Sequence, residues 1–172
     1  MITPNKPILK NNFFCYIRLK KNQVDTSGVE EIAKEKGFRK QTFRHITIFS
    51  SKNFDIIQVV LNKGEQQKIK NQLRQKIKEL DWSYEQKDIY LISKKINKTE
   101  KRQSYIMAIK MPAIGEFFKY VNKLLHTNIP TQYPHITLFT KGESKNPKYY
   151  GIPIPSTKEF KTLKPIKIKN NS

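Results

Sequence analysis

Hydrophobic positions along the chain recur with two different periods. Spacings of three and four residues predict helices, whereas alternation or a short apolar run predicts strands. Positions 65–80 have the clearest helical spacing, with polar Gln and Lys residues between the apolar ones. A second helical stripe at positions 114–125 follows Pro112, and proline is common in the first turn of a helix. The apolar stripe of the predicted helix at positions 65–80 consists of Ile69, Leu73, Ile77 and Leu80.

Strands and helices alternate along the rest of the chain, which favours an α/β or α+β domain. A length of 172 residues is usual for one domain, so we expect a single domain over residues 1–172. Residues 82–96 are expected to form two strands or a hairpin, residues 161–169 an edge strand, and residues 1–12 and 170–172 loose tails. The pattern predicts strands at 13–19, 44–50, 104–111 and 135–141, and helices at 27–36, 65–80 and 113–126.

The chain divides into two similar halves. Each half contains a strand, a helix and then a strand that begins with histidine, at His45 in the first half and His135 in the second. These segments read His-Ile-Thr-Ile-Phe and His-Ile-Thr-Leu-Phe, and they stand 90 residues apart (135 − 45). The order of elements therefore predicts an internal duplication.

Residues i and i+2 of a strand point to the same face. His45 and Thr47 therefore form one half-site, and His135 and Thr137 form a second. We expect the half-sites to face one another across a groove and surround one phosphate. Cleavage of a phosphodiester needs a base and an acid, and histidine serves as either near neutral pH, because its pKa is ordinarily about 6.5. Threonine hydroxyls can donate to the phosphate oxygens.

A lone histidine on a strand is ordinarily a satisfied, partly buried side chain. Two matched copies in equivalent places favour catalysis instead. A zinc site would need further ligands near the two histidines, and the sequence offers no Cys, Asp or Glu motif there. The third histidine, His126, falls at the C-terminal end of a predicted helix, where a basic side chain interacts favourably with the helix dipole. The single cysteine, Cys15, lies in an apolar run and is expected to be a core residue.

The net charge of +20 bears on the kind of partner that the protein would bind. It arises from 34 Lys and Arg residues against 14 Asp and Glu residues. Such a charge attracts polyanions, and nucleic acid is the first partner to consider. The alternative is that the lysines only solvate the surface. No apolar stretch reaches the roughly 20 residues of a membrane span, and no signal peptide is apparent. We therefore expect a soluble, cytoplasmic protein.

The paired motifs resemble those of the two-histidine (2H) phosphoesterase superfamily, which includes LigT-like proteins and cyclic phosphodiesterases. The resemblance covers residues 13–169 and implies a bilobal, pseudo-two-fold α+β fold. In that fold two antiparallel sheets form a central cleft, with helices outside. Neither a metal nor a cofactor is implied. The cleft would be lined by His45, Thr47, His135 and Thr137.

The resemblance implies cleavage of a phosphodiester or 2′,3′-cyclic phosphate at RNA ends or in small oligoribonucleotides, with the histidine roles exchangeable. Alternatives are hydrolysis of cyclic mono- or oligonucleotide signals, as in phage enzymes that counter immunity, and an RNA-binding module without activity. We expect a monomer. Residues 145–156 are expected to form an ordered loop at one end of the cleft. By position, the candidate substrate-binding residues are Tyr16, Arg18, Tyr133 and Lys141, although each is equally an ordinary core or surface group.

Overall fold

The computed structural model describes residues 1–96, 101–143, 152, 154 and 156–166. Its helices are α1 (Ser27–Glu35), α2 (Ser51–Val60), α3 (Lys63–Glu79), α4 (Pro112–Leu125) and α5 (Thr157–Phe160), with a short 3-10 helix at Lys21–Gln23. Its strands are β1 (Ile8–Leu9), β2 (Cys15–Arg18), β3 (Arg39–Lys40), β4 (His45–Phe49), β5 (Glu85–Ile96), β6 (Lys101–Lys110), β7 (His135–Glu143) and β8 (Lys164–Pro165). The fold is thus of the mixed α+β class.

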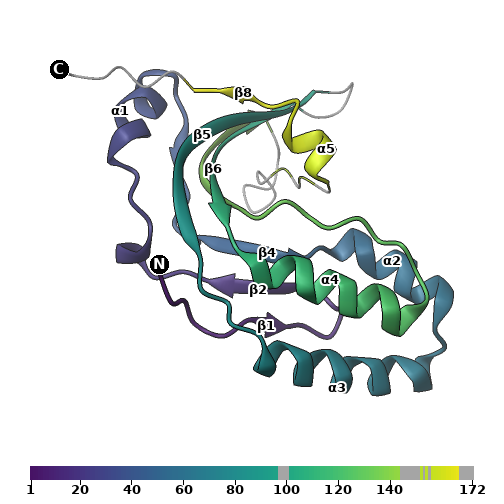
Figure 1. Cartoon of the computed structure of the whole chain (residues 1–172). Helices are drawn as coiled ribbons and strands as arrows, with labels where there is room; N and C mark the ends of the chain where they lie inside the picture. The colour runs from purple at the N-terminus through teal and green to yellow at the C-terminus, as the bar shows by residue number, and fades with distance from the viewer. Residues whose placement is uncertain (97–100, 144–151, 153, 155, 167–172) are drawn as a thin grey trace.

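All eight strands belong to one antiparallel sheet. Its order is β1-β2-β4-β7-β6-β5-β8, and β3 pairs with β7 beside this path. The long strands β5 and β6 bend strongly, so the sheet has an inner and an outer face in this region (Figure 1). Figure 1 shows α1 outside the bend, α5 inside it, and α3 and α4 near β1 and β2.

The main core lies between the sheet and helices α1, α3 and α4, and it joins the two halves of the chain. Phe118 of α4, a second-half helix, packs on Phe49 of β4, with ring centres 5.6 Å apart. Phe38, which follows α1, packs on Tyr105 of β6 at 4.1 Å. Each half therefore covers strands of the other half with its own helix or the residues that follow it. Cys15 is buried as expected, and burial raises the pKa of its thiol to about 12.

Several predicted elements need correction. Residues 82–96 do not contain two strands or a hairpin of their own. Residues 85–96 form the single strand β5, and its hairpin partner is the next strand, β6. Residues 1–12 are not a loose tail: Ile2 bridges to Tyr84, and β1 pairs with β2. No element was predicted for residues 51–60, which form helix α2. Of the expected edge strand at 161–169, residues 164–165 form β8 beside β5, while residues 167–169 and the expected loose tail at 170–172 lie outside the described part of the chain.

The arrangement of the halves also differs from the expected one. In place of two sheets around a cleft, β4 of the first half and β7 of the second half are neighbours in a single sheet. Within the part of the chain that the structure describes, no helix has the length and apolar character needed to cross a membrane.

Candidate functional site

The two His-Ile-Thr segments occupy the same place in two matched strand pairs. We call residues 45–49 the first motif and residues 135–139 the second motif. In the first pair Arg18 of β2 lies opposite His45 and Tyr16 opposite Thr47. In the second pair Ala108 of β6 lies opposite His135 and Ile106 opposite Thr137. All these positions correspond at a spacing of 90 residues, so the duplication predicted from the sequence extends to the register of the strands.

Both motifs also contain the same irregularity. One extra residue, Ile48 in the first motif and Leu138 in the second, has no partner in the neighbouring strand. Such a β-bulge breaks the strict alternation of side chains. As a result the aliphatic residue and the following phenylalanine both enter the core, while the histidine and threonine before them stay on the other face. The bulge separates the half-site from the core-forming end of each motif.

Direct pairing of the motif strands brings the two half-sites together. Ile46 of β4 lies opposite Ile136 of β7 in an antiparallel pair. It follows that His45 lies beside Thr137 and that Thr47 lies beside His135. The two histidines are then diagonal neighbours, which in a sheet are about 7–8 Å apart. The half-sites lie side by side on one face, and this spacing suits two groups that flank one phosphate.

This face is the inner face of the bent sheet. Ile106, which lies opposite Thr137, packs in a small apolar cluster with Leu91 and Ile154, and Phe160 of α5 packs against that cluster. Figure 1 shows α5 inside the bend.

His135 is almost fully buried, with 6% of its surface exposed. Its Nδ1 lies 2.9 Å from the carbonyl oxygen of Tyr133. Because a carbonyl only accepts, Nδ1 carries the proton, and in the neutral ring Nε2 is left free to accept one. The pKa of His135 is lowered to about 4: burial is the main cause, the nearby charge of His45 adds to it, and the Tyr133 carbonyl opposes it in part. His135 is therefore neutral at pH 7.

His45 is held in a similar way but in a more open place. It is half-buried, and burial lowers its pKa, while the carbonyl of Phe43 raises it. That carbonyl occupies the place of Tyr133 in the second motif, two residues before the histidine. Unlike Nδ1 of His135, the buried Nδ1 of His45 has no hydrogen-bond partner among the described residues. The rings of Phe14, Tyr16 and Phe43 surround the imidazole, with centres 6.4, 5.8 and 5.2 Å away.

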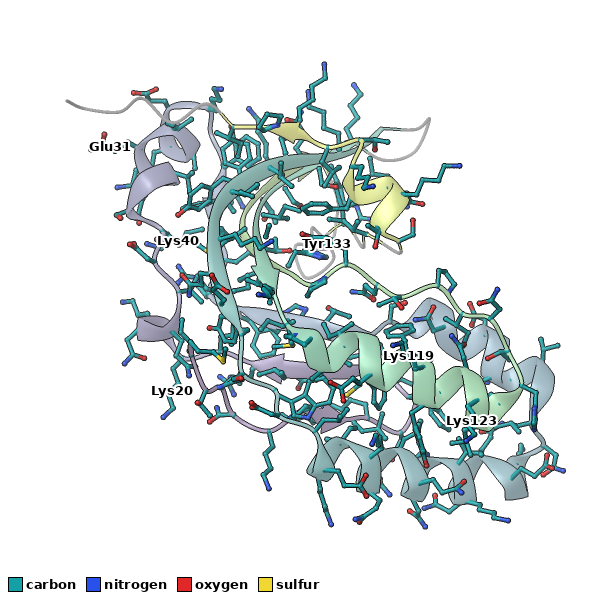
Figure 2. All side chains as sticks on the ribbon, viewed as in Figure 1. Lys20, Glu31, Lys40, Lys119, Lys123 and Tyr133 are labelled. Atoms are coloured by element: carbon teal, nitrogen blue, oxygen red, sulfur yellow. The ribbon has the colours of Figure 1, made fainter. Side chains whose placement is uncertain are left out.

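The four candidate substrate-binding residues lie in different surroundings. Arg18 and Tyr16 lie on β2 directly beside the first motif, opposite His45 and Thr47. Arg18 is exposed and Tyr16 is buried. Tyr133 is half-buried and stacks on Phe160 at 3.4 Å between ring centres, and Figure 2 shows it inside the bend, near α5.

Lys141 is separated from the motif histidines. The bulge at Leu138 shifts the alternation of β7, so that Lys141 lies on the outer face and its Nζ donates to the carbonyl of Lys36, at 2.7 Å. There it helps to line an open hollow of about 600 Å³ with Gly37 and Tyr105. The position of Lys141 close to the second motif in the sequence was therefore misleading.

Two glutamines near the motifs escaped the sequence analysis. Gln132, 2% exposed, donates from Nε2 to the carbonyl of Thr47 at 3.3 Å. Gln41 donates from Nε2 to the hydroxyl of Thr140 at 2.7 Å, and its backbone N–H donates to the carbonyl of Leu138. Each glutamine thus ties the segment before one motif to the strand of the other. A glutamine three or four residues before each histidine is the signal that sequence reading could have used.

Among the described residues, no group of three or more His, Cys, Asp and Glu side chains is placed to hold a metal ion. Most of the expected loop at 145–156 lies outside the described residues. No family model, curated protein or solved structure matches the chain.

Proposed function

We propose that the protein is a two-histidine phosphodiesterase that cleaves a phosphodiester or cyclic phosphate of RNA or a small oligonucleotide. The observation that carries the proposal is the paired register of β4 and β7, which sets His45 beside Thr137 and Thr47 beside His135. Paired half-sites of this kind are what the resemblance to the two-histidine phosphoesterases implies, although here both lie in one continuous sheet. Both half-sites belong to one chain, which is consistent with a monomeric enzyme.

The proposed reaction uses one imidazole as a base and the other as an acid. The neutral ring accepts the proton of the attacking hydroxyl or water through Nε2, and the protonated ring delivers a proton to the leaving oxygen. Burial favours the neutral form of both rings. A bound phosphodiester carries negative charge, which raises the pKa of a nearby imidazole and lets one ring hold its proton.

The hydroxyls of Thr47 and Thr137 complete the proposed site. Each lies on the inner face beside the histidine of the other motif, where it can donate to a non-bridging phosphate oxygen as charge develops there. The two imidazoles supply both proton transfers, so the proposed reaction needs no metal ion.

The test replaces each histidine of the chain by asparagine in turn. Wild type and the three variants are assayed in EDTA on a 2′,3′-cyclic nucleotide, an RNA oligomer ending in a cyclic phosphate, a 2′-5′ oligomer and a cyclic dinucleotide. We expect His45→Asn and His135→Asn each to lower kcat by at least about a hundredfold, the usual contribution of a general acid or base. His126→Asn is the matched control, because His126 caps α4 at φ 51, a conformation that asparagine tolerates.

Two outcomes would oppose the proposal. In the first, His126→Asn abolishes turnover as fully as His45→Asn and His135→Asn do. That result would point to a general effect of these substitutions on folding. Absence of turnover on the whole panel, with salt-sensitive RNA binding unchanged in all three variants, would instead support an RNA-binding module without activity.

A further inference from the structure

The two halves of the site have the same backbone but different side chains beside the histidines. Next to the first motif stand Arg18 and Tyr16, and at the matching positions of the second half stand Ala108 and Ile106. Arg18 is exposed, whereas Ala108 and Ile106 are completely buried. The pseudo-symmetry is therefore broken where a substrate would extend beyond the scissile phosphate.

Phe43 gives the first half an open aromatic surface. It is 43% exposed, a large fraction for a phenylalanine so close to a motif histidine. Its ring centre is 5.2 Å from that of His45 and 5.9 Å from that of Tyr16, so the ring is held in place by its neighbours. The guanidinium carbon of Arg18 lies 5.4 Å from the centre of the same ring. A cation and an exposed ring are thus fixed side by side at the site.

In the second half the chain itself fills the matching place. Tyr133 stands two residues before His135, as Phe43 does before His45, but its ring is stacked on Phe160 with an angle of 11° between the planes. Ile106 and Leu163 pack in the cluster beneath this pair. One face of the Tyr133 ring is therefore already covered by a side chain of the protein itself. Of the two aromatic residues that stand two positions before the motif histidines, Phe43 is the exposed one.

We propose that Phe43 and Arg18 form a subsite for the nucleotide adjacent to the scissile phosphate, with the base on Phe43 and the next phosphate on Arg18. This inference rests on the proposed function and specifies its substrate. Aromatic rings stack on any nucleobase, and arginine binds phosphate through several N–H groups. The substrate is accordingly a single-stranded oligonucleotide, linear or cyclic, and a mononucleotide uses only part of the site.

Binding tests the subsite without need of turnover. The probe is a fluorescent RNA tetranucleotide with a 3′-phosphate, and a second probe lacks the base of the nucleotide next to that phosphate. We expect Phe43→Ala to raise the Kd of the complete probe about tenfold, as usual for the loss of one base stack. Removal of the base from the probe and removal of the Phe43 ring from the protein disrupt the same contact. The two losses of binding free energy therefore do not add when both groups are absent. Ile89→Ala is the matched control, since Ile89 is 46% exposed on β5.

Arg18 is tested by the dependence of binding on salt. Loss of one phosphate contact lowers the slope of log Kd against log salt concentration by about 0.7 for a single strand. We expect this change for Arg18→Ala. Arg74→Ala removes the same charge from the exposed side of α3 and should leave the slope as in wild type. Equal effects of the two arginine variants would show that only the total charge matters.

Hydrolysis then distinguishes linear from cyclic substrates and separates this inference from the proposed function. If Phe43→Ala lowers kcat/KM for the cyclic-phosphate RNA oligomer about tenfold more than for the cyclic mononucleotide, the substrate is linear. If instead kcat/KM for the cyclic dinucleotide falls about tenfold more than for the cyclic mononucleotide, the substrate is cyclic. Equal losses on all substrates, or losses matched by Ile89→Ala, would overturn the subsite. Loss of activity in the histidine variants alone would leave the enzyme proposal intact.

Discussion

His135 combines burial with a fixed tautomer. Its ring is almost inaccessible to water, yet its Nδ1 donates to the carbonyl of Tyr133 and its pKa is lowered to about 4. Burying a histidine in its neutral form makes the folded state resist protonation. Burial also lowers the pKa of His45, and the charge of a protonated His45 would further favour the neutral form of His135.

The pKa of His135 is about 6.5 in the unfolded state and about 4 in the folded state. The free energy of unfolding should therefore fall as the pH falls from about 6.5 to about 4. Between these values the unfolded chain binds more protons, so acid favours unfolding. For His135 alone the loss is about 3 kcal/mol. Urea unfolding at pH 7 and pH 4.5 measures it. We expect the pH dependence of His135→Asn to be smaller than that of wild type by most of this amount, and equal dependence would contradict the lowered pKa.

Four residues of the candidate site could be singled out from the sequence because they repeat. His45 and His135, with their threonines, share a local pattern, and strand alternation then decides which face they occupy. Gln132 was missed because the carbonyl that it reaches, that of Thr47, belongs to the other half of the chain. Phe43 was missed because its neighbours Tyr16 and Arg18 come from a different strand, so its place beside them depends on folding and not on the local sequence.

At the scale of elements, the end of β7 lies very close to the beginning of β6. Gly142 of β7 lies opposite Arg102 of β6. A Cβ at position 142 would stand 2.6 Å from the carbonyl oxygen of Lys101, a distance that forces the backbone to move. The periodicity of the sequence marked both strands but gave no sign of this close contact, which depends on how the two backbones meet.

Gly142→Ala should lower the free energy of unfolding by about 1–3 kcal/mol, the usual effect of overpacking. Gly115→Ala should act in the opposite direction. Gly115 lies within α4, where a Cβ would meet no atom within 4 Å, and alanine in place of glycine in a helix stabilises by roughly 0.5–1 kcal/mol. Thermal or urea unfolding of the two variants measures both changes. Destabilisation of equal size in both would show that the contact with Lys101 is not the cause.

At the scale of the whole molecule, the two halves are joined by a continuous sheet and by helices that pack across the division. Alternation of hydrophobic residues predicted the strands themselves, but the single sheet depends on pairing between segments 90 residues apart in sequence. Local patterns carry no information on such pairing. The packing of α4 on β4 through Phe118 and Phe49 makes separate unfolding of either half unfavourable.

Unfolding should therefore be a single transition. The buried side chain of Trp82, 5.9 Å from Phe117 between ring centres, reports the core by fluorescence, and circular dichroism reports the secondary structure. We expect the two signals to coincide. Phe118→Ala should shift both together and lower the free energy of unfolding by about 3–5 kcal/mol. Val59→Ala, at a position 89% exposed, should change it by less than about 0.5 kcal/mol. Separate transitions would show that the halves are independent.

The hydrogen bond between Tyr133 and His135 has a consequence for evolution. The residue two positions before the histidine fixes the tautomer with its main-chain carbonyl, while its side chain takes no part in that bond. We infer that this position can accept new side chains without loss of the imidazole's orientation. A duplicated ancestor could therefore have changed one copy to receive a ligand and the other to close against its own chain, as Phe43 and Tyr133 now differ, while both histidines stayed in place.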